Sequence, residues 1–327
     1  MLTDSSQASV PATPRIVFVP GQNPKPEPGV HRRLLWRCLL EGVRRADENI
    51  YHWIRAQPEI FALADWNALF YPNQIAAVDT QATIEELLRA EDGAGPGDEV
   101  LRERRRMTLM FIMGDMFPFL AQRIPDPQIK NTMMEALRYF ENHGRQADRV
   151  RAHVRQTVLQ ALQSKGPLLL IGHSLGSVVS FDMLWESTHL YADPWDVDLF
   201  MSLGSPLGTH FVRSRRLGAG HGKVGRYPEG IRRWVNIAAD GDCIALNRQM
   251  SEDYSSMLEL DLTKGISDHT NGVQNAFRDK DGWNPHRSYG YLANLVTGTE
   301  IANWLRGHAM PAEAPGPGSA IGIELED

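Results

Sequence analysis

The segment Gly172–Gly176 reads Gly-His-Ser-Leu-Gly, which places a potential nucleophile between two glycines at the spacing G-x-S-x-G. Residues 168–171 are apolar and predict a strand that is buried on both faces. Residues 178–184 carry apolar side chains at helical spacing. A serine on a turn between a strand and a helix has a strained backbone that exposes its hydroxyl, and small neighbours prevent crowding there. Ser174 is therefore the candidate nucleophile.

A serine nucleophile needs a base that takes its proton and a carboxylate that orients this base. In proteins with this kind of turn, the acid and then the histidine follow the serine along the chain. A strand predicted at 234–238 ends just before Asp240 and Asp242. We favour Asp242 because residues 243–245 can turn the chain back into the core while the carboxylate faces the sheet edge. Asp240 is the alternative acid.

Three of the eleven histidines follow these acids, namely His269, His286 and His308. His308 directly precedes a tail rich in Pro, Gly and acidic residues, so we set it aside. His286 lies in a loop that enters the last apolar helix, where a base can lean over the strand ends. His269 also lies in a polar segment. We therefore predict His286 as the base and keep His269 as the alternative.

Acyl transfer also needs two backbone N–H groups that stabilise the developing oxyanion. Leu175 follows the nucleophile at the start of the predicted helix, whose dipole favours negative charge. Gly21 and Gln22 lie in a loop after the first predicted strand, Arg15–Val19. We expect Leu175 to supply one N–H and Gln22, next to Gly21, to supply the other.

The remaining pattern alternates between strands and helices. Predicted strands occupy 15–19, 62–66, 168–171, 197–203 and 234–238, with a weaker one at 258–262. Predicted helices occupy 32–53, 83–89, 98–120, 131–164 with a break, and 290–306. Short sequential connections between them indicate an α/β protein with an open, mostly parallel sheet and helices on both faces.

Composition excludes several classes of protein. The net charge of -6 argues against a nucleic-acid-binding protein, which usually has a basic surface. The two cysteines, Cys38 and Cys243, lack the spacing of a zinc site and are interpreted as free thiols. Neither metal-ligand spacing nor a phosphate-binding glycine loop occurs, so we expect no metal and no organic cofactor.

The chain shows no signal for a membrane. Its first residues lack the basic and then apolar pattern of a secretory signal. Residues 107–120 are strongly apolar, but they are too few to span a bilayer and are interrupted by Gly, Asp and Pro. We therefore expect no transmembrane segment and a cytoplasmic location, and the sequence leaves the oligomeric state open.

Six segments in order, RIVFVPGQNPK, DWNALFYP, LLLIGHSLGSVVSFDML, LFMSLGSPLG, RRWVNIAADGDCIA and NPHRSYGYL, resemble the α/β-hydrolase superfamily, with a spacing similar to lipase-like serine esterases. The resemblance covers residues 15–307. It implies one catalytic domain there, between flexible segments at 1–14 and 308–327. It also implies a serine hydrolase that cleaves a carboxylic ester of a small molecule through an acyl-enzyme.

Two features depart from that family. Pro20-Gly21 stands where such enzymes commonly have His-Gly, and the His is usually structural. Residues 80–150 form a larger insertion than a minimal fold needs and resemble a helical cap. Four of its side chains could line an apolar pocket for an acyl chain, or could equally form the core of a cap helix: Met110, Met113, Met116 and Phe117.

Other activities remain open on the same residues. A lipase, phospholipase, thioesterase or amidase would use the same serine, histidine and acid, because acyl transfer tolerates several leaving groups. A binding protein that keeps the fold without catalysis is the alternative from a different class. Redox use of the fold, as in cofactor-free haloperoxidases, is a more distant alternative.

Overall fold

The computed structural model describes residues 12–71, 77–90, 127–245, 247–280 and 282–308. Within these residues the chain forms a central sheet of six strands in the order β2-β1-β3-β4-β5-β6, and every neighbouring pair is parallel. A separate antiparallel pair, β7 and β8, lies after the sheet. The strands are β1 Thr13–Val19, β2 Phe61–Leu63, β3 Lys165–His173, β4 Val197–Leu203, β5 Ile231–Ile237, β6 Gly265–His269, β7 Arg278–Asp279 and β8 Gly282–Trp283.

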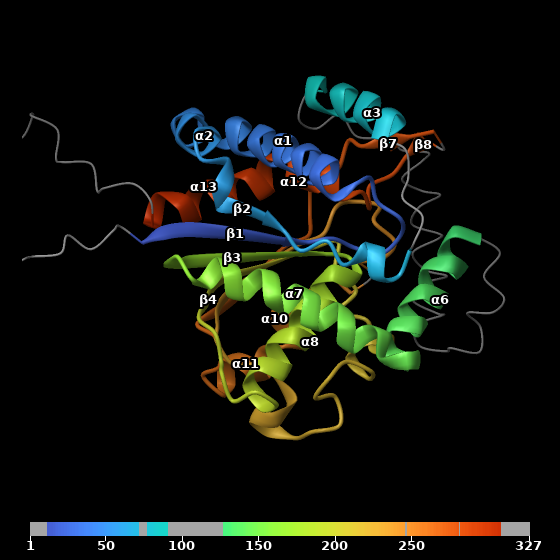
Figure 1. The fold of residues 1–327 in the computed structure, drawn as a ribbon, viewed down its shortest axis with the longest axis vertical. Coiled ribbons are helices and arrows are strands. Elements are labelled where there is room, and N and C mark those ends of the chain that lie inside the picture. The colour runs from blue at the N-terminus through green and yellow to red at the C-terminus, as the bar shows by residue number, and fades with distance from the viewer. Residues whose placement is uncertain (1–11, 72–76, 91–126, 246, 281, 309–327) are drawn as a thin grey trace, which may run out of the picture.

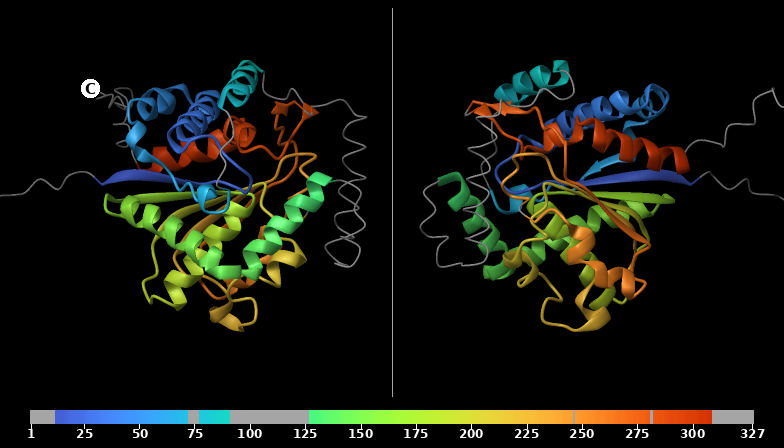
Figure 2. Two further views of the ribbon diagram at one scale, coloured as in Figure 1. Left: turned by 45° about the vertical axis from the view of Figure 1, so that its right-hand side comes forward. Right: turned by 180° about the vertical axis from the view of Figure 1, so that it is seen from behind.

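Helices cover both faces of this sheet (Figures 1 and 2). On one face lie α1 Pro28–Ala46, α2 Glu48–Arg55, α3 Ala77–Arg89, α12 Ser288–Leu292 and α13 Leu295–His308. On the other lie α7 Gln146–Leu162, α8 Leu175–His189, α10 Met250–Asp253 and α11 Ser255–Glu259. The remaining helical elements are α6 Pro127–Glu141 and α9 His210–Arg213, with the short 3-10 turns η1 Pro58–Ile60, η2 Asn67–Leu69, η3 His143–Arg145 and η4 Lys223–Arg226.

Each face of the sheet has its own apolar core. Side chains that alternate along β1 and β3 contribute to opposite cores, as expected for strands covered on both sides. Ile16 of β1 packs under α1 and α13, whereas its neighbour Val17 packs under α7 and α8. The fully buried apolar run of β3 is therefore explained by helices on both faces. The cysteines Cys38 and Cys243 are both buried as thiols that form no disulfide among the described residues, as predicted.

The strands that form the centre of the sheet end at one level. Val19 of β1 is aligned with Gly172 of β3, and His173 is aligned with Leu203 of β4. Leu203 in turn is aligned with Ile237 of β5. The loops that follow these strands therefore emerge side by side at the carboxyl edge of the sheet, which is where open α/β sheets bind ligands.

The predicted strand at 258–262 is wrong. The alternating leucines there suggested a strand, but Leu258 lies in α11 with its side chain 39% exposed, whereas the adjacent Met257 is fully buried. The helix ends at Glu259, and the positive φ of 55° at Asp261 lets the N–H of Leu262 bond to the carbonyl of Met257. The sixth strand is β6, which follows this turn.

Two predicted helices are each divided. The predicted helix at 32–53 is interrupted at Asp47, which is extended and whose carboxylate accepts from the N–H of Ile50 as the cap of α2. The predicted helix at 290–306 is interrupted at Asn294, whose side chain accepts from the N–H of Val296. In both cases the apolar spacing of the side chains continues across the capping residue, so the spacing by itself predicts one helix where there are two.

Part of the predicted organisation lies outside the described residues. This applies to 91–126 within the insertion predicted at 80–150, and to segments 1–11 and 309–327 at the two ends. The helix predicted at 98–120 falls in the same region. Among the helices that the structure does describe, none combines the length and the apolar composition needed to cross a membrane.

Candidate functional site

Ser174 occupies the turn between β3 and α8 with φ 53° and ψ -129°. This is a positive φ in a residue with a side chain, a strained conformation that persists only where the surroundings impose it. The N–H of Ser174 donates to the carbonyl of Leu203 on β4 at 3.0 Å, and its carbonyl accepts from the Ser177 hydroxyl at 2.6 Å. The serine is thus held between two strands and the first turn of α8.

Three glycines let the backbone approach this serine closely. A Cβ on Gly172 would lie 2.5 Å from the Cα of Ser177, and one on Gly176 would lie 2.3 Å from the carbonyl oxygen of Val19. A Cβ on Gly21 would lie 2.8 Å from the Cβ of Ser174. All three distances are shorter than real Cβ contacts. The loop after β1 therefore lies directly against Ser174.

A continuous hydrogen-bonded chain joins Ser174, His286 and Asp242. The Oγ of Ser174 lies 2.9 Å from Nε2 of His286. Nδ1 of the same ring lies 3.0 Å from Oδ1 and 2.9 Å from Oδ2 of Asp242. The side chain of His286 is 26% exposed, so it lies between the buried acid and the surface. The structure brings these three residues together from different elements. Ser174 lies on the turn after β3, Asp242 in the loop after β5, and His286 in the loop before α12.

Asp242 is buried yet ionised. Burial by itself would raise the pKa of this carboxyl, but the charge and hydrogen bond of His286, with bonds from Tyr291 and Ile244, lower the pKa to about 2. The hydroxyl of Tyr291 donates to Oδ2 at 2.6 Å, and the N–H of Ile244 donates to Oδ1 at 2.9 Å. An ionised carboxylate only accepts, so Nδ1 of His286 carries the hydrogen and Nε2 is left to accept from the serine hydroxyl.

His173 holds the backbone of the loop that carries His286. Its Nε2 lies 2.7 Å from the carbonyl oxygen of His286, so this nitrogen carries the hydrogen. Burial, with the charges of His286 and Lys25, lowers the pKa of His173 well below its usual value. His173 is therefore a neutral donor that ties the backbone of His286 to the end of β3.

The loop after β1 is held by two residues that follow β2, Trp66 and Asn67. Nδ2 of Asn67 donates to the carbonyl of Gly21 at 2.8 Å and to that of Asn23 at 3.0 Å. The indole N–H of Trp66 donates to the carbonyl of Pro20 at 2.8 Å. The C=O and N–H groups of a trans peptide point in opposite directions. Because Asn67 holds the carbonyl of Gly21, the N–H of Gln22 in the same peptide points away from Asn67.

Leu175 is the first residue of α8. The first N–H groups of a helix have no acceptor within it, and they carry the positive end of the helix dipole. Ser174 precedes this N–H directly, and Gly21 lies against Ser174 from the other side. Leu175 and the Gly21-Gln22 peptide therefore lie on two sides of the same hydroxyl.

The alternative acid and base lie apart from Ser174. Asp240 accepts from the N–H of Gly272 at 3.2 Å and lies 3.7 Å from Arg248. His269 was expected in a loop but is the last residue of the edge strand β6, and its Nε2 lies 2.8 Å from Glu300. His308 ends α13 and lies 2.7 Å from Asp198 at the opposite edge of the sheet.

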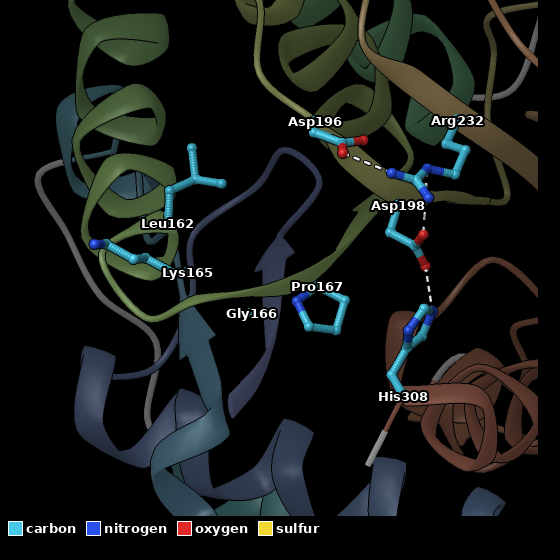
Figure 3. Close-up of a pocket in the computed structure, with 8 residues that line it drawn as sticks. All are labelled: Leu162, Lys165, Gly166, Pro167, Asp196, Asp198, Arg232 and His308. Atoms are coloured by element: carbon cyan, nitrogen blue, oxygen red, sulfur yellow. Dashed lines mark hydrogen bonds and ion pairs between the residues drawn. The ribbon is translucent and has the colours of Figure 1, made fainter. Parts of the chain in front are cut away.

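A cavity of about 400 Å³ opens at that opposite edge (Figure 3). It lies where β3, β4 and β5 begin, and four of its charged side chains, Asp196, Asp198, Arg232 and His308, pair with one another. Arg232 lies 2.6 Å from Asp196 and 3.6 Å from Asp198. This cavity is therefore separate from the site at Ser174.

Sequence reasoning missed three residues that position the site. Tyr291 lies in a segment that was predicted only as a helix, Asn67 directly follows a predicted strand, and Gly204 follows β4. Gly204 has a φ of 55°, and a Cβ there would lie 2.8 Å from Oδ2 of Asp242. Of these three residues, only Gly204 had a recognisable signal in the sequence, because a glycine directly after a core strand indicates that another group approaches the backbone closely.

The four side chains proposed for an acyl pocket, Met110, Met113, Met116 and Phe117, fall outside the described residues. Within the described ranges, His, Cys, Asp and Glu side chains nowhere gather in the groups of three or more that could hold a metal ion.

Comparisons with known proteins returned no match, whether to family models, to curated proteins or to solved structures.

Proposed function

We propose that the chain is a serine hydrolase that cleaves a carboxylic ester through an acyl-enzyme intermediate. The observation that carries this proposal is the hydrogen-bonded chain from Ser174 through His286 to Asp242. A hydroxyl, an imidazole and a buried carboxylate in this order form the arrangement that activates serine for acyl transfer. The strained φ of Ser174 adds support, because strain in a residue of this kind concentrates at functional sites.

Each group has a role in the proposed reaction. The Oγ of Ser174 attacks the ester carbonyl while Nε2 of His286 takes its proton. Asp242 holds the imidazole and stabilises the imidazolium that forms. His286 then gives the proton to the departing alkoxide, and the alcohol leaves. A water molecule, deprotonated by His286, attacks the acyl-enzyme and releases the acid.

The developing oxyanion needs donors that are in place before the reaction. We assign this role to the N–H groups of Leu175 and of Gln22. The contact between Gly21 and Ser174 supports the assignment, as does the bond from Asn67 that orients the intervening peptide. The Pro at position 20 does not weaken it, because the carbonyl of Pro20 has its own donor in Trp66.

We further propose that the domain has the α/β-hydrolase fold with a helical cap. The parallel sheet, with a serine at the turn between β3 and α8, supports the fold. The long connection between β2 and β3, which includes α3 and α6, supports the cap. This cap would cover the carboxyl edge of the sheet and would set the size of the substrate.

The test is covalent labelling with a fluorophosphonate together with turnover of short p-nitrophenyl esters. We expect the wild-type protein to label at Ser174. We expect Ser174→Ala to abolish labelling and to lower turnover at least about a thousandfold. Ser214→Ala, which alters an exposed serine outside the site, is the matched control and should label normally.

Folded wild-type protein that neither labels nor turns over esters would contradict the proposal and favour the alternative of a catalytically silent binding protein. If labelling succeeds, turnover of a panel of esters, thioesters, amides and phospholipids shows whether the enzyme is an esterase or instead a lipase, phospholipase, thioesterase or amidase. These activities share the acyl-enzyme step and differ only in the leaving group.

A further inference from the structure

A lysine without a counter-ion lies on the loop that contacts Ser174. Lys25 is half-buried, and its Nζ donates to the carbonyl of Gln22 at 2.7 Å. Among the described residues, no carboxylate lies within ion-pair distance of this ammonium group. A partly buried cation is usually paired, so an unpaired one this close to a nucleophile has a different explanation.

A second cation lies on the loop that carries His286, whose Nε2 contacts the Oγ of Ser174. Arg287 follows His286 directly, and its Nε is buried without a hydrogen-bond partner among the described residues. One terminal nitrogen lies 3.7 Å from Asp279, which is longer than a charged hydrogen bond. The side chain is 43% exposed. Arg287 therefore retains donors that a ligand can use.

Each cation lies on a loop that contacts Ser174, and the charge of Arg287 acts on Lys25. Burial and the charge of Arg287 lower the pKa of Lys25 to about 7, against smaller raising contributions from Asp65 and Glu135. Among the described residues neither acid forms an ion pair with the lysine, and Oε2 of Glu135 is bonded to Tyr71. The lysine charge also lowers the pKa values of two buried histidines, His31 and His173.

We propose that Lys25 and Arg287 form a binding site for an anionic group, a carboxylate or a phosphate, on the ester substrate. This inference rests on the proposed function and names its substrate class. Two cations that repel each other destabilise the free site, and an anion between them removes the repulsion and fills the unused donors. The anion would hold the ester with its carbonyl against Ser174.

The test compares matched esters that differ by one charge. Mono(4-nitrophenyl) succinate and its methyl ester differ in charge on the acyl part, and 4-acetoxybenzoate and its methyl ester differ in charge on the leaving group. The measured quantity is the ratio of kcat/KM for the anionic ester to that for the neutral one. We expect the wild-type ratio to exceed 1 for at least one pair.

Removing either cation should lower that ratio. We expect Lys25→Gln and Arg287→Gln each to reduce it by roughly 10- to 100-fold, the range of a hydrogen bond to a charged group. Lys264→Gln is the matched control, because Lys264 is exposed, directly precedes the start of β6 at the edge opposite Ser174, and forms an ion pair with Asp261. Its ratio should equal that of the wild type.

The ratio should also depend on pH. The ammonium form of Lys25 exists below its pKa of about 7, so the preference for the anionic ester is largest there and falls as the pH rises towards 9. Lys25→Arg should keep the preference and remove its pH dependence, because a guanidinium stays charged.

The outcomes separate this inference from the proposed function. Wild-type protein that labels at Ser174 and hydrolyses neutral esters, with no preference in either pair, would overturn the anion site alone. An anionic preference that persists in both Lys25→Gln and Arg287→Gln would do the same. Absence of labelling and of all turnover overturns the proposed function, and the anion site with it.

Discussion

At the scale of single residues, the ionised state of Asp242 decides the chemistry of the site. Tyr291 donates to this carboxylate and accepts from the N–H of Ala239 at 2.8 Å, so the phenol bridges the acid to the end of β5. Desolvation and the neighbouring carboxylate raise the pKa of Tyr291 well above its usual value, which keeps it a donor. The carboxylate therefore stays charged although its side chain is fully buried.

Asn67 is predicted to act on catalysis through the loop that it holds. We expect Asn67→Ala to lower kcat about 10- to 100-fold with little change in KM, because the N–H of Gln22 would no longer be preorganised. The measurement is steady-state turnover of a neutral p-nitrophenyl ester, with the free energy of unfolding determined in parallel.

Trp66→Phe is the matched control for Asn67→Ala. It removes one hydrogen bond to the same loop, at Pro20, and keeps an aromatic ring in the core. Both variants should lose about 1–3 kcal/mol of stability from an unsatisfied buried group. Equal losses of kcat in the two variants would show that Asn67 has only a structural role.

At the scale of elements, the site depends on how closely α8 approaches β1. Gly176 lies in the first turn of α8, and a Cβ there would also lie 2.5 Å from the carbonyl oxygen of Pro20. Both contacts are with backbone atoms, which cannot rotate away. The glycine therefore sets the distance between the helix that begins after Ser174 and the loop that follows the first strand.

We predict that Gly176→Ala lowers the free energy of unfolding by about 1–3 kcal/mol through overpacking and also reduces turnover, because it displaces Gly21 from Ser174. Chemical denaturation and ester turnover measure the two effects. Gly307→Ala, in a helix with open space around it, should have neither effect. A fully stable and active Gly176→Ala variant would refute the close approach.

At the scale of the whole molecule, the two edges of the sheet have separate roles. The carboxyl edge carries Ser174, and the opposite edge fixes the last helix to the start of β4. There the indole N–H of Trp304 donates to Oδ2 of the buried Asp198 at 2.6 Å. Because the strands are parallel, the length of β4 separates this bond from the hydroxyl of Ser174.

Trp304→Phe is predicted to lower the free energy of unfolding by about 1–3 kcal/mol, since Asp198 loses a buried donor and the core loses part of the indole. Turnover per folded molecule should be unchanged, because distant sites act independently. Thermal unfolding and kcat at a temperature well below the transition measure this. A large loss of kcat in folded protein would mean that the two edges are coupled.

Several features were predictable because local pattern alone specifies them. The strand at Val197–Leu203 was predicted with its observed bounds, since seven consecutive residues are buried on both sides. The leucines at 258–262 misled the prediction because alternation does not show whether both faces of a segment meet a partner. The strained turn at Ser174 was predictable because two glycines and a helical repeat mark it.

The sequence by itself determined the α/β order of the elements, the turn that carries Ser174 and a short list of acids and histidines. Only the tertiary structure decided that Asp242 and His286, rather than Asp240 and His269, reach Ser174. That choice depends on which loops meet at the carboxyl edge, and β6 carries His269 away to Glu300 on α13. The contributions of Asn67, Tyr291 and Lys25 became visible in the same way, because contacts between residues far apart in the chain leave no local pattern.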